Sequence, residues 1–180
     1  MKPLEELISG YRTEHAEEAA YIGAFLELLK HPDAFERNHL PGHITGSAWI
    51  LDRSLDSVAL VLHGKLGRWM QPGGHADGDR NVVRVALRET EEETGLTPQS
   101  LTDGIWDLDI HPIPARKDMP AHLHYDVRFC FQDFGGTLRI SAESSDLKWI
   151  PISEVSEYTD SQSVIRMVDK TIQFRNQWPQ

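Results

Sequence analysis

The chain has 180 residues, of which 39% are hydrophobic, and it carries a formal net charge of −10 at pH 7. This length suits one compact domain, and the hydrophobic content argues against a disordered chain. The negative charge argues against nonspecific nucleic-acid binding, because Lys and Arg supply the affinity for phosphate backbones.

Cysteine content and hydropathy limit the cellular context. Cys130 is the only cysteine, so no intramolecular disulfide can form. The sequence shows no signal-peptide pattern and no apolar run of about 18 or more residues. We therefore expect a cytoplasmic protein with no membrane association.

The first third of the chain predicts a helical segment followed by two strands. Residues 1 to about 31 are expected to be helical, with a break near Gly10. Apolar residues then recur at helical spacing: Ala19, Ile22, Phe25, Leu26 and Leu29. Packing of this stripe on a sheet is the preferred interpretation, and a dimer contact is the alternative. Strands are predicted over residues 43–52 and 57–63, which are rich in branched and aromatic residues.

A glycine-rich loop and a helix are predicted next. Residues 64–80 contain many glycines, which predicts a loop that bends closely around a ligand. The helix begins near residues 79–81 and ends at Gly95 in a left-handed cap. Its inward face is predicted to consist of Val83, Ala86, Leu87 and Thr90.

Three carboxylates share one face of this helix. Glu89, Glu92 and Glu93 stand at positions i, i+3 and i+4. Like charges at such spacings cost about 0.2–0.5 kcal/mol per pair, and a hard divalent cation would reverse that sign. The pattern therefore indicates Mg²⁺ or Mn²⁺.

The second half of the chain predicts two long strands, a short strand and a closing helix. Strands are expected over residues 105–111, 122–132 and 147–152, and a helix over 161–176. In the strand over 122–132, apolar residues alternate with polar ones, so one sheet face is polar and needs partners. The closing helix is expected to bury Val164, Met167, Val168 and Ile172.

The stretch from Gly74 to Leu96 resembles the Nudix box, the signature GX5EX7REUXEEXGU, in which U is an apolar residue. The matching positions are Gly74, Arg88, Glu89, Glu92, Glu93, Gly95 and Leu96. Two positions depart from the pattern. Arg80 stands where the first Glu is expected, with Asp79 one residue earlier, and Thr90 replaces an apolar residue. That first Glu is mostly a structural partner in the family, so its displacement bears on loop geometry more than on chemistry.

The resemblance covers about residues 43–152 and implies an α/β (α+β) fold. This would be a Nudix-type α/β/α sandwich with a mixed β-sheet and an added N-terminal helical segment. We expect a single Nudix hydrolase domain over residues 1–180. It would consist of an N-terminal extension (1–40), the core (43–152) and a C-terminal helix (153–180).

The resemblance also implies an enzyme that acts on phosphoric anhydride bonds. It would use Mg²⁺ or Mn²⁺ and water to cleave the diphosphate linkage of an NDP-sugar, ADP-ribose or a nucleotide. By position, the metal ligands would be the Gly73 carbonyl, Glu89, Glu92 and Glu93, and Arg88 would orient Glu89. The general base would be Glu89 or Glu143, and Glu143 could instead be a metal ligand.

Substrate contacts are expected from polar side chains near the box. His122 and His124 on one strand face, with His75 and His111, could meet a zinc ion, but recognition of phosphate or sugar oxygens is the preferred use. Trp69 would stack on a base or lie in the core. The full set of candidate substrate residues is Lys65, Arg68, Trp69, His75, His111, His124 and Arg128.

Two other functions remain open. A Nudix-fold regulator would bind a ligand without turnover, although such proteins often lose the box glutamates, which are present here. An isopentenyl-diphosphate isomerase would need a catalytic Cys near the start of the box, whereas Cys130 lies far beyond it. The expected partner is a small nucleoside diphosphate derivative, with no nucleic acid and a possible homodimer.

Overall fold

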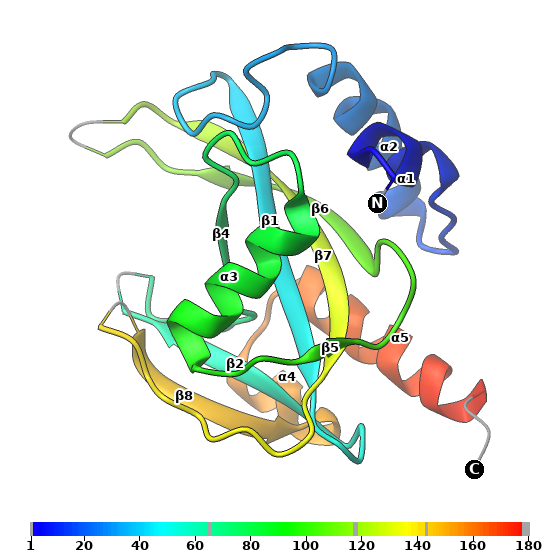
Figure 1. The fold of residues 1–180 in the computed structure, drawn as a ribbon, viewed down its shortest axis with the longest axis vertical. Coiled ribbons are helices and arrows are strands. Elements are labelled where there is room, and N and C mark those ends of the chain that lie inside the picture. The colour runs from blue at the N-terminus through cyan, green and yellow to red at the C-terminus, as the bar shows by residue number, and fades with distance from the viewer. Residues whose placement is uncertain (1, 65, 117–118, 143, 178–180) are drawn as a thin grey trace. The chain divides into compact units, whose positions relative to one another are not determined.

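The computed structural model describes residues 2–64, 66–116, 119–142 and 144–177 (Figure 1). The helices are α1 (Leu4–Gly10), α2 (Ala16–Leu28), α3 (Val82–Thr94), α4 (Val155–Tyr158) and α5 (Gln162–Gln177), with a 3-10 turn at Ile152–Glu154. The strands are β1 (Gly42–Leu51), β2 (Ser57–His63), β3 (Arg68–Met70), β4 (Gly73–His75), β5 (Gln99–Ser100), β6 (Asp107–Ile113), β7 (His122–Gln132) and β8 (Ser144–Pro151). Among the described residues, no helix is long and apolar enough to cross a membrane.

The chain divides into two compact units, and each is described by itself. The first unit comprises Met1–Ser47, Gly73–Ala86 and Thr102–Phe129. The second comprises Ala48–Pro72, Leu87–Leu101 and Cys130–Gln180. Three elements, β1, α3 and β7, contribute residues to both. The expected single domain over residues 1–180 stays a prediction.

Antiparallel pairing organises the strands of the first unit. β4 pairs with the first half of β1, so that Thr45 lies opposite His75 and Ser47 lies opposite Gly73. A side chain at Gly73 would place its Cβ 2.1 Å from the Ser47 hydroxyl, so this register requires glycine. β6 pairs with β7 over its whole length.

The N-terminal helices pack on strands of the same unit. α2 contacts β6 (Figure 1), and the Phe25 ring meets the Tyr125 ring edge-on at 5.2 Å between centroids. This confirms that α2 packs on strands. The predicted stripe is wrong in part, because Ala19 is exposed and the neighbouring Glu18 is fully buried.

Glu18 replaces the expected apolar contact with hydrogen bonds. Its Oε1 accepts the Leu108 backbone N–H of β6 at 3.0 Å and the Tyr11 hydroxyl at 2.6 Å. Its Oε2 accepts the Thr13 hydroxyl. A buried carboxylate is tolerated only when such donors compensate for lost hydration, so these contacts tie α2 to β6.

In the second unit, β2 pairs antiparallel with β3, β8 and the end of β1. α5 buries Val164, Met167 and Val168 as predicted, but Ile172 is 44% exposed. Thr171 takes the inward position instead, since its hydroxyl accepts the Trp49 indole N–H at 2.9 Å. A buried Trp needs such an acceptor, and apolar periodicity does not detect it.

α3 begins and ends close to where the sequence predicts. The Asn81 side chain accepts the Arg84 backbone N–H at 3.1 Å, which caps the first turn. Gly95 follows the helix with a φ of +72°, so the left-handed cap is confirmed. The inward face is shifted, because Val82 and Val85 are buried while Val83 is only half-buried.

The segment over residues 64–80 is more regular than the predicted loop. It contains the short strands β3 and β4, each of three residues. Glycine lowers strand propensity, and here sheet pairing overrides that local preference.

Candidate functional site

The second unit carries the acidic turn of α3. Arg88 Nη2 donates to Glu89 Oε1 at 2.6 Å, so the expected Arg88–Glu89 contact is present. Arg88 Nε lies 4.0 Å from Glu92 Oε1. The Glu89 side chain is 16% exposed and that of Glu92 is 62% exposed. One guanidinium therefore orients the more buried carboxylate and leaves the other facing solvent.

The donor set of this turn suits a hard cation. Glu89, Glu92 and Glu93 supply carboxylate oxygens, which Mg²⁺ and Mn²⁺ prefer, and Glu93 Oε2 is buried. Gly73 belongs to the first unit, and its part as a ligand stays a prediction. Lys65 and Glu143 lie outside the described residues.

Asp79, the residue that stands near the first Glu of the box, is a structural partner in the first unit. Its carboxylate accepts the Asn81 backbone N–H at 2.9 Å and two Arg84 guanidinium N–H groups, each at 2.7 Å. Asp79 therefore holds the loop against the first turn of α3.

The polar face predicted for β7 finds its partners within the first unit. Arg128 donates to Asp126 at 2.8 Å, to Asp109 at 2.9 Å and to Asp107 at 3.1 Å. Asp126 also accepts the hydroxyls of Thr45 and Ser47, two residues of the neighbouring strand β1. This group, here called the buried carboxylate network, consists of Asp107, Asp109, Asp126 and Arg128.

Arg128, a candidate substrate residue from the sequence, is instead buried. The residue is 2% exposed. Burial opposes its charge, but the three carboxylates, Asp126 first among them, outweigh that effect and raise the pKa of Arg128 above its usual value. The guanidinium donates to the three carboxylates of the network, and the side chain has almost no exposed surface for a substrate phosphate.

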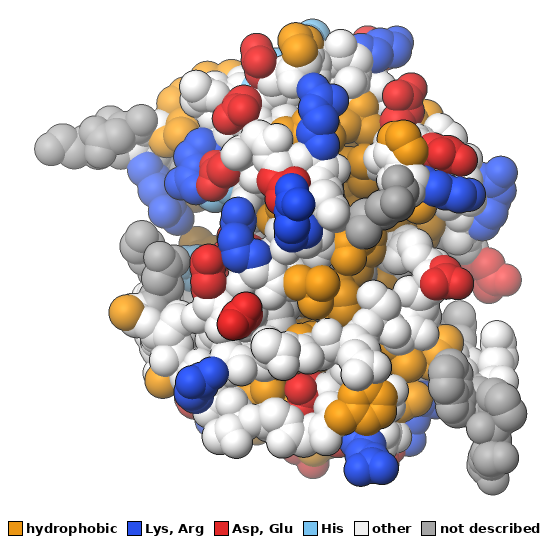
Figure 2. Space-filling view, in the orientation of Figure 1, with side chains coloured by type: hydrophobic (Ala, Val, Ile, Leu, Met, Phe, Trp, Pro, Cys, Tyr) orange, Lys and Arg blue, Asp and Glu red, His pale blue; other side chains and the backbone are white. Residues whose placement is uncertain are grey.

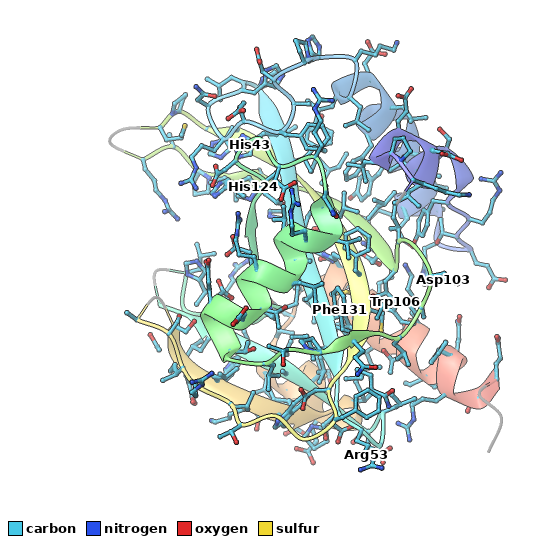
Figure 3. The ribbon with its side chains drawn as sticks, in the orientation of Figure 1. His43, Arg53, Asp103, Trp106, His124 and Phe131 are labelled. Carbon is cyan, nitrogen blue, oxygen red and sulfur yellow. The ribbon has the colours of Figure 1, made fainter. Side chains whose placement is uncertain are left out.

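Five histidines gather next to this network in the first unit. Neighbouring rings lie 5.0–5.5 Å apart between centroids, and Figure 3 shows His43 and His124 side by side. The members of this histidine cluster are His43, His75, His111, His122 and His124. Each of His43, His75 and His124 offers a ring nitrogen within 4.8 Å of the other two.

Burial keeps the central rings neutral. It lowers the pKa of His75 to about 4 and of His124 to about 2, with smaller contributions from the other histidines and, for His75, from Arg37. It also lowers the pKa of His43. His111 Nδ1 lies 3.0 Å from Asp109 Oδ2 and so joins the cluster to the buried carboxylate network.

Four members of this cluster were candidates from the sequence, namely His75, His111, His122 and His124, whereas His43 was not. The signal for His43 was present, because His43, Thr45 and Ser47 alternate along β1 and face the same side of the sheet. Such alternation shows that a face is polar, but it does not show which strand lies opposite.

Arg68 and Trp69 lie on β3 in the second unit. Arg68 is exposed. The Trp69 ring has Lys148 Nζ 5.1 Å from its centroid and meets the Tyr158 ring edge-on at 5.5 Å. Trp69 is thus half-buried within its own unit and already in contact with a cation.

Acidic and basic side chains are interspersed over α3 in the space-filling view (Figure 2). The face shown has no broad basic patch of the kind that binds nucleic-acid backbones.

The family model of the NUDIX domain matches residues 41–170. The asymmetrical bis(5'-nucleosyl)-tetraphosphatase of Mus musculus is 27% identical over 106 residues, which cover 58% of this chain and 69% of that protein. A CMP-5'-(N-acetyl-N-hydroxy-3-aminopropyl)phosphonate hydrolase of Streptomyces rubellomurinus is 29% identical over 89 residues. That match covers 49% of this chain and only 40% of the relative, less than half of its length.

Solved structures agree on the fold. A C. elegans Ap4A hydrolase has a TM-score of 0.56 at 16% identity, covering 75% of this chain and 98% of that chain. The NUDIX domain of Shewanella oneidensis NrtR, in complex with ADP ribose, has a TM-score of 0.54 at 21% identity and covers 91% and 99%. The expected α/β (α+β) Nudix fold with added N-terminal helices is therefore confirmed. Since the family model matches most of its length, the chain belongs to the NUDIX family, and its expected class, a Nudix hydrolase, is confirmed.

Proposed function

We propose that the chain is a metal-dependent pyrophosphohydrolase that cleaves the diphosphate linkage of a nucleoside diphosphate derivative. The observation that carries this proposal is the acidic turn of α3, where Arg88 holds Glu89 and the other two glutamates share its face. The substrate class is an NDP-sugar, ADP-ribose or a nucleotide. The similarity to a dinucleoside tetraphosphatase and to an ADP-ribose complex supports a nucleotide-derived ligand.

The proposed ligands of Mg²⁺ or Mn²⁺ are Glu89, Glu92, Glu93 and the Gly73 carbonyl. Such an ion reduces the charge of the phosphoryl oxygens and acidifies a bound water. Arg88 would hold Glu89 in orientation through a charge-assisted hydrogen bond.

Proton removal from the attacking water requires a base. The proposed base is Glu89 or Glu143, and Glu143 could instead be a metal ligand. Cys130 is no candidate for the acid–base cysteine of an isomerase. It is 1% exposed, and burial raises its pKa, so the side chain stays a neutral thiol.

We propose that Arg68 and Lys65 bind phosphate oxygens and that Trp69 stacks on the base of the substrate. The Lys148 ammonium group lies over one face of the Trp69 ring, so a nucleobase stacking on that face would have to displace it. The proposed partner of the chain is thus a small nucleotide-derived molecule. A homodimer stays a prediction.

The test is a panel of nucleotides and NDP-sugars assayed for release of nucleoside monophosphate with and without Mg²⁺. We expect Glu93→Gln to lower kcat by about 100-fold or more, since it removes a ligand charge without removing volume. Glu91→Gln is the matched control, because Glu91 is exposed on the same turn and outside the triad. It should change kcat by less than about twofold.

Two outcomes of this assay would overturn the proposal. One is hydrolysis that proceeds equally well after removal of all divalent ions. The other is full activity of Glu93→Gln at saturating Mg²⁺. Circular dichroism of both variants shows whether a loss of activity reflects loss of folding.

A further inference from the structure

We propose that the first unit contains a second metal site of different chemistry, in which His43, His75 and His124 bind a transition metal of the zinc class. Imidazole nitrogens suit Zn²⁺ and its neighbours in the periodic table, whereas Mg²⁺ prefers oxygen. The site therefore goes beyond the proposed hydrolase chemistry and does not depend on it.

The backbone brings these three rings together from separate strands. His43 lies on β1, His75 on β4 and His124 on β7. β4 pairs with β1, and β1 neighbours β7 in the sheet. Their ligand nitrogens lie within 4.8 Å of one another, and tetrahedral zinc with bonds of about 2.0–2.1 Å requires a separation of about 3.3 Å. Metal binding would therefore have to draw the ring nitrogens closer together.

His43 is held in the tautomer that leaves its Nε2 available to bind a metal. Its Nδ1 lies 3.3 Å from the His39 carbonyl, which can only accept, so Nδ1 carries the proton and Nε2 keeps its lone pair. A backbone carbonyl that holds the second ring nitrogen is a common support for metal-binding histidines.

Two of the ring nitrogens are buried without a hydrogen bond. Within the part of the chain that the structure describes, His43 Nε2 and His124 Nε2 have no partner. His43 itself is 0% exposed. A buried polar atom without a hydrogen bond destabilises the fold, so its retention needs a reason. A metal ion bound to both lone pairs would supply it.

The surrounding charge also favours a cation. Three neutral imidazoles leave the full 2+ charge of the ion uncompensated. The buried carboxylate network places three carboxylates around one guanidinium, a formal charge of −2, and His111 connects Asp109 to the cluster at 3.0 Å. The nearby Arg37 is paired by two hydrogen bonds with Asp77, which offsets its repulsion.

The alternative occupant, a substrate phosphate, fits these three rings less well. Neutral imidazoles attract an anion weakly, and the carboxylate network beside them repels it. The three histidines leave a fourth position of a tetrahedral ion open to water.

The experiment uses the full chain, freed of metal by chelation and kept in excess Mg²⁺ so that the glutamates are saturated. Zn²⁺ is titrated in competition with a chromophoric chelator, and the melting temperature is measured with and without Zn²⁺. We expect one zinc per chain and a higher melting temperature on binding. His75→Gln and His124→Gln should each weaken zinc binding by more than about 10-fold. Loss of a residue that only supports a ligand already costs about 10-fold in affinity, and loss of the ligand itself should cost more.

Two controls separate this site from other binding. His15→Gln is the matched variant, because His15 precedes α2 and its side chain makes no capping hydrogen bond. It should bind zinc like the parent protein, and so should Glu93→Gln, whose loss of hydrolysis tests the other proposal. The inference is overturned if the parent protein takes up no stoichiometric zinc, or if folded His75→Gln and His124→Gln bind it as tightly as His15→Gln.

Discussion

Arg128 shows how the surroundings of a single residue determine its role. On sequence alone, an arginine in a strand with polar alternation is a candidate phosphate ligand. In the structure its side chain is 3% exposed and its guanidinium is shared among three carboxylates. The planar fork of five N–H donors matches that arrangement, so the residue organises the polar face of β7 rather than a substrate.

Removing the Arg128 guanidinium should destabilise the fold. We expect Arg128→Leu to lower the free energy of unfolding by about 3–5 kcal/mol, because it leaves buried carboxylates without a counter-charge. Arg128→Lys should lose less, since it keeps the charge but not the fork. Urea denaturation measures both.

The control for this prediction is Arg53→Leu, a change of the same type at an exposed position. It should cost less than about 0.5 kcal/mol. Equal stability of the Arg53 and Arg128 leucine variants would mean that the carboxylate network is not held by Arg128.

At the scale of elements, α2 depends on a polar contact with β6. Glu18→Ala would strip acceptors from the buried Leu108 N–H and the Tyr11 hydroxyl. We expect a loss of about 2–3 kcal/mol in unfolding free energy, the cost of unsatisfied buried donors. Thermal melting followed by circular dichroism measures it. Glu14→Ala, at an exposed residue just before α2, should leave the melting temperature almost unchanged, and an equal loss in both variants would contradict the assignment.

Periodicity predicted most elements of this chain well. The strand over residues 122–132 matches β7 at both ends, and the acidic helix and its glycine cap lie where the box pattern places them. These features depend on the local spacing of apolar residues and on the conformational preference of single residues, such as glycine for a left-handed helix cap.

Tertiary partners account for what the sequence missed. Glu18 and Thr171 are polar yet buried, because a backbone N–H and an indole N–H face them from distant elements. His43 is a candidate ligand only because β4 and β7 carry other histidines to it. Contacts between residues far apart in sequence leave no periodic trace in either segment, so apolar spacing alone could not find them.

At the scale of the molecule, the formal charge of −10 opposes the binding of nucleic acids and other polyanions. A polyphosphate backbone is bound mainly through release of counterions by Lys and Arg. Here acidic residues outnumber basic ones, 28 to 18. A short nucleotide differs, because the metal ion proposed at the glutamates would supply the local positive charge that the molecule as a whole lacks.

We therefore expect no binding of duplex DNA even at low ionic strength. Fluorescence anisotropy of a labelled duplex at about 50 mM salt, with protein up to about 100 µM, covers the usual range of nonspecific affinities. The measurement is made with and without Mg²⁺, because an ion bound at the glutamates would attract phosphates. A saturable rise in anisotropy that weakens with added salt would contradict this prediction and show a basic surface that the net charge conceals, whereas a flat signal would agree with it.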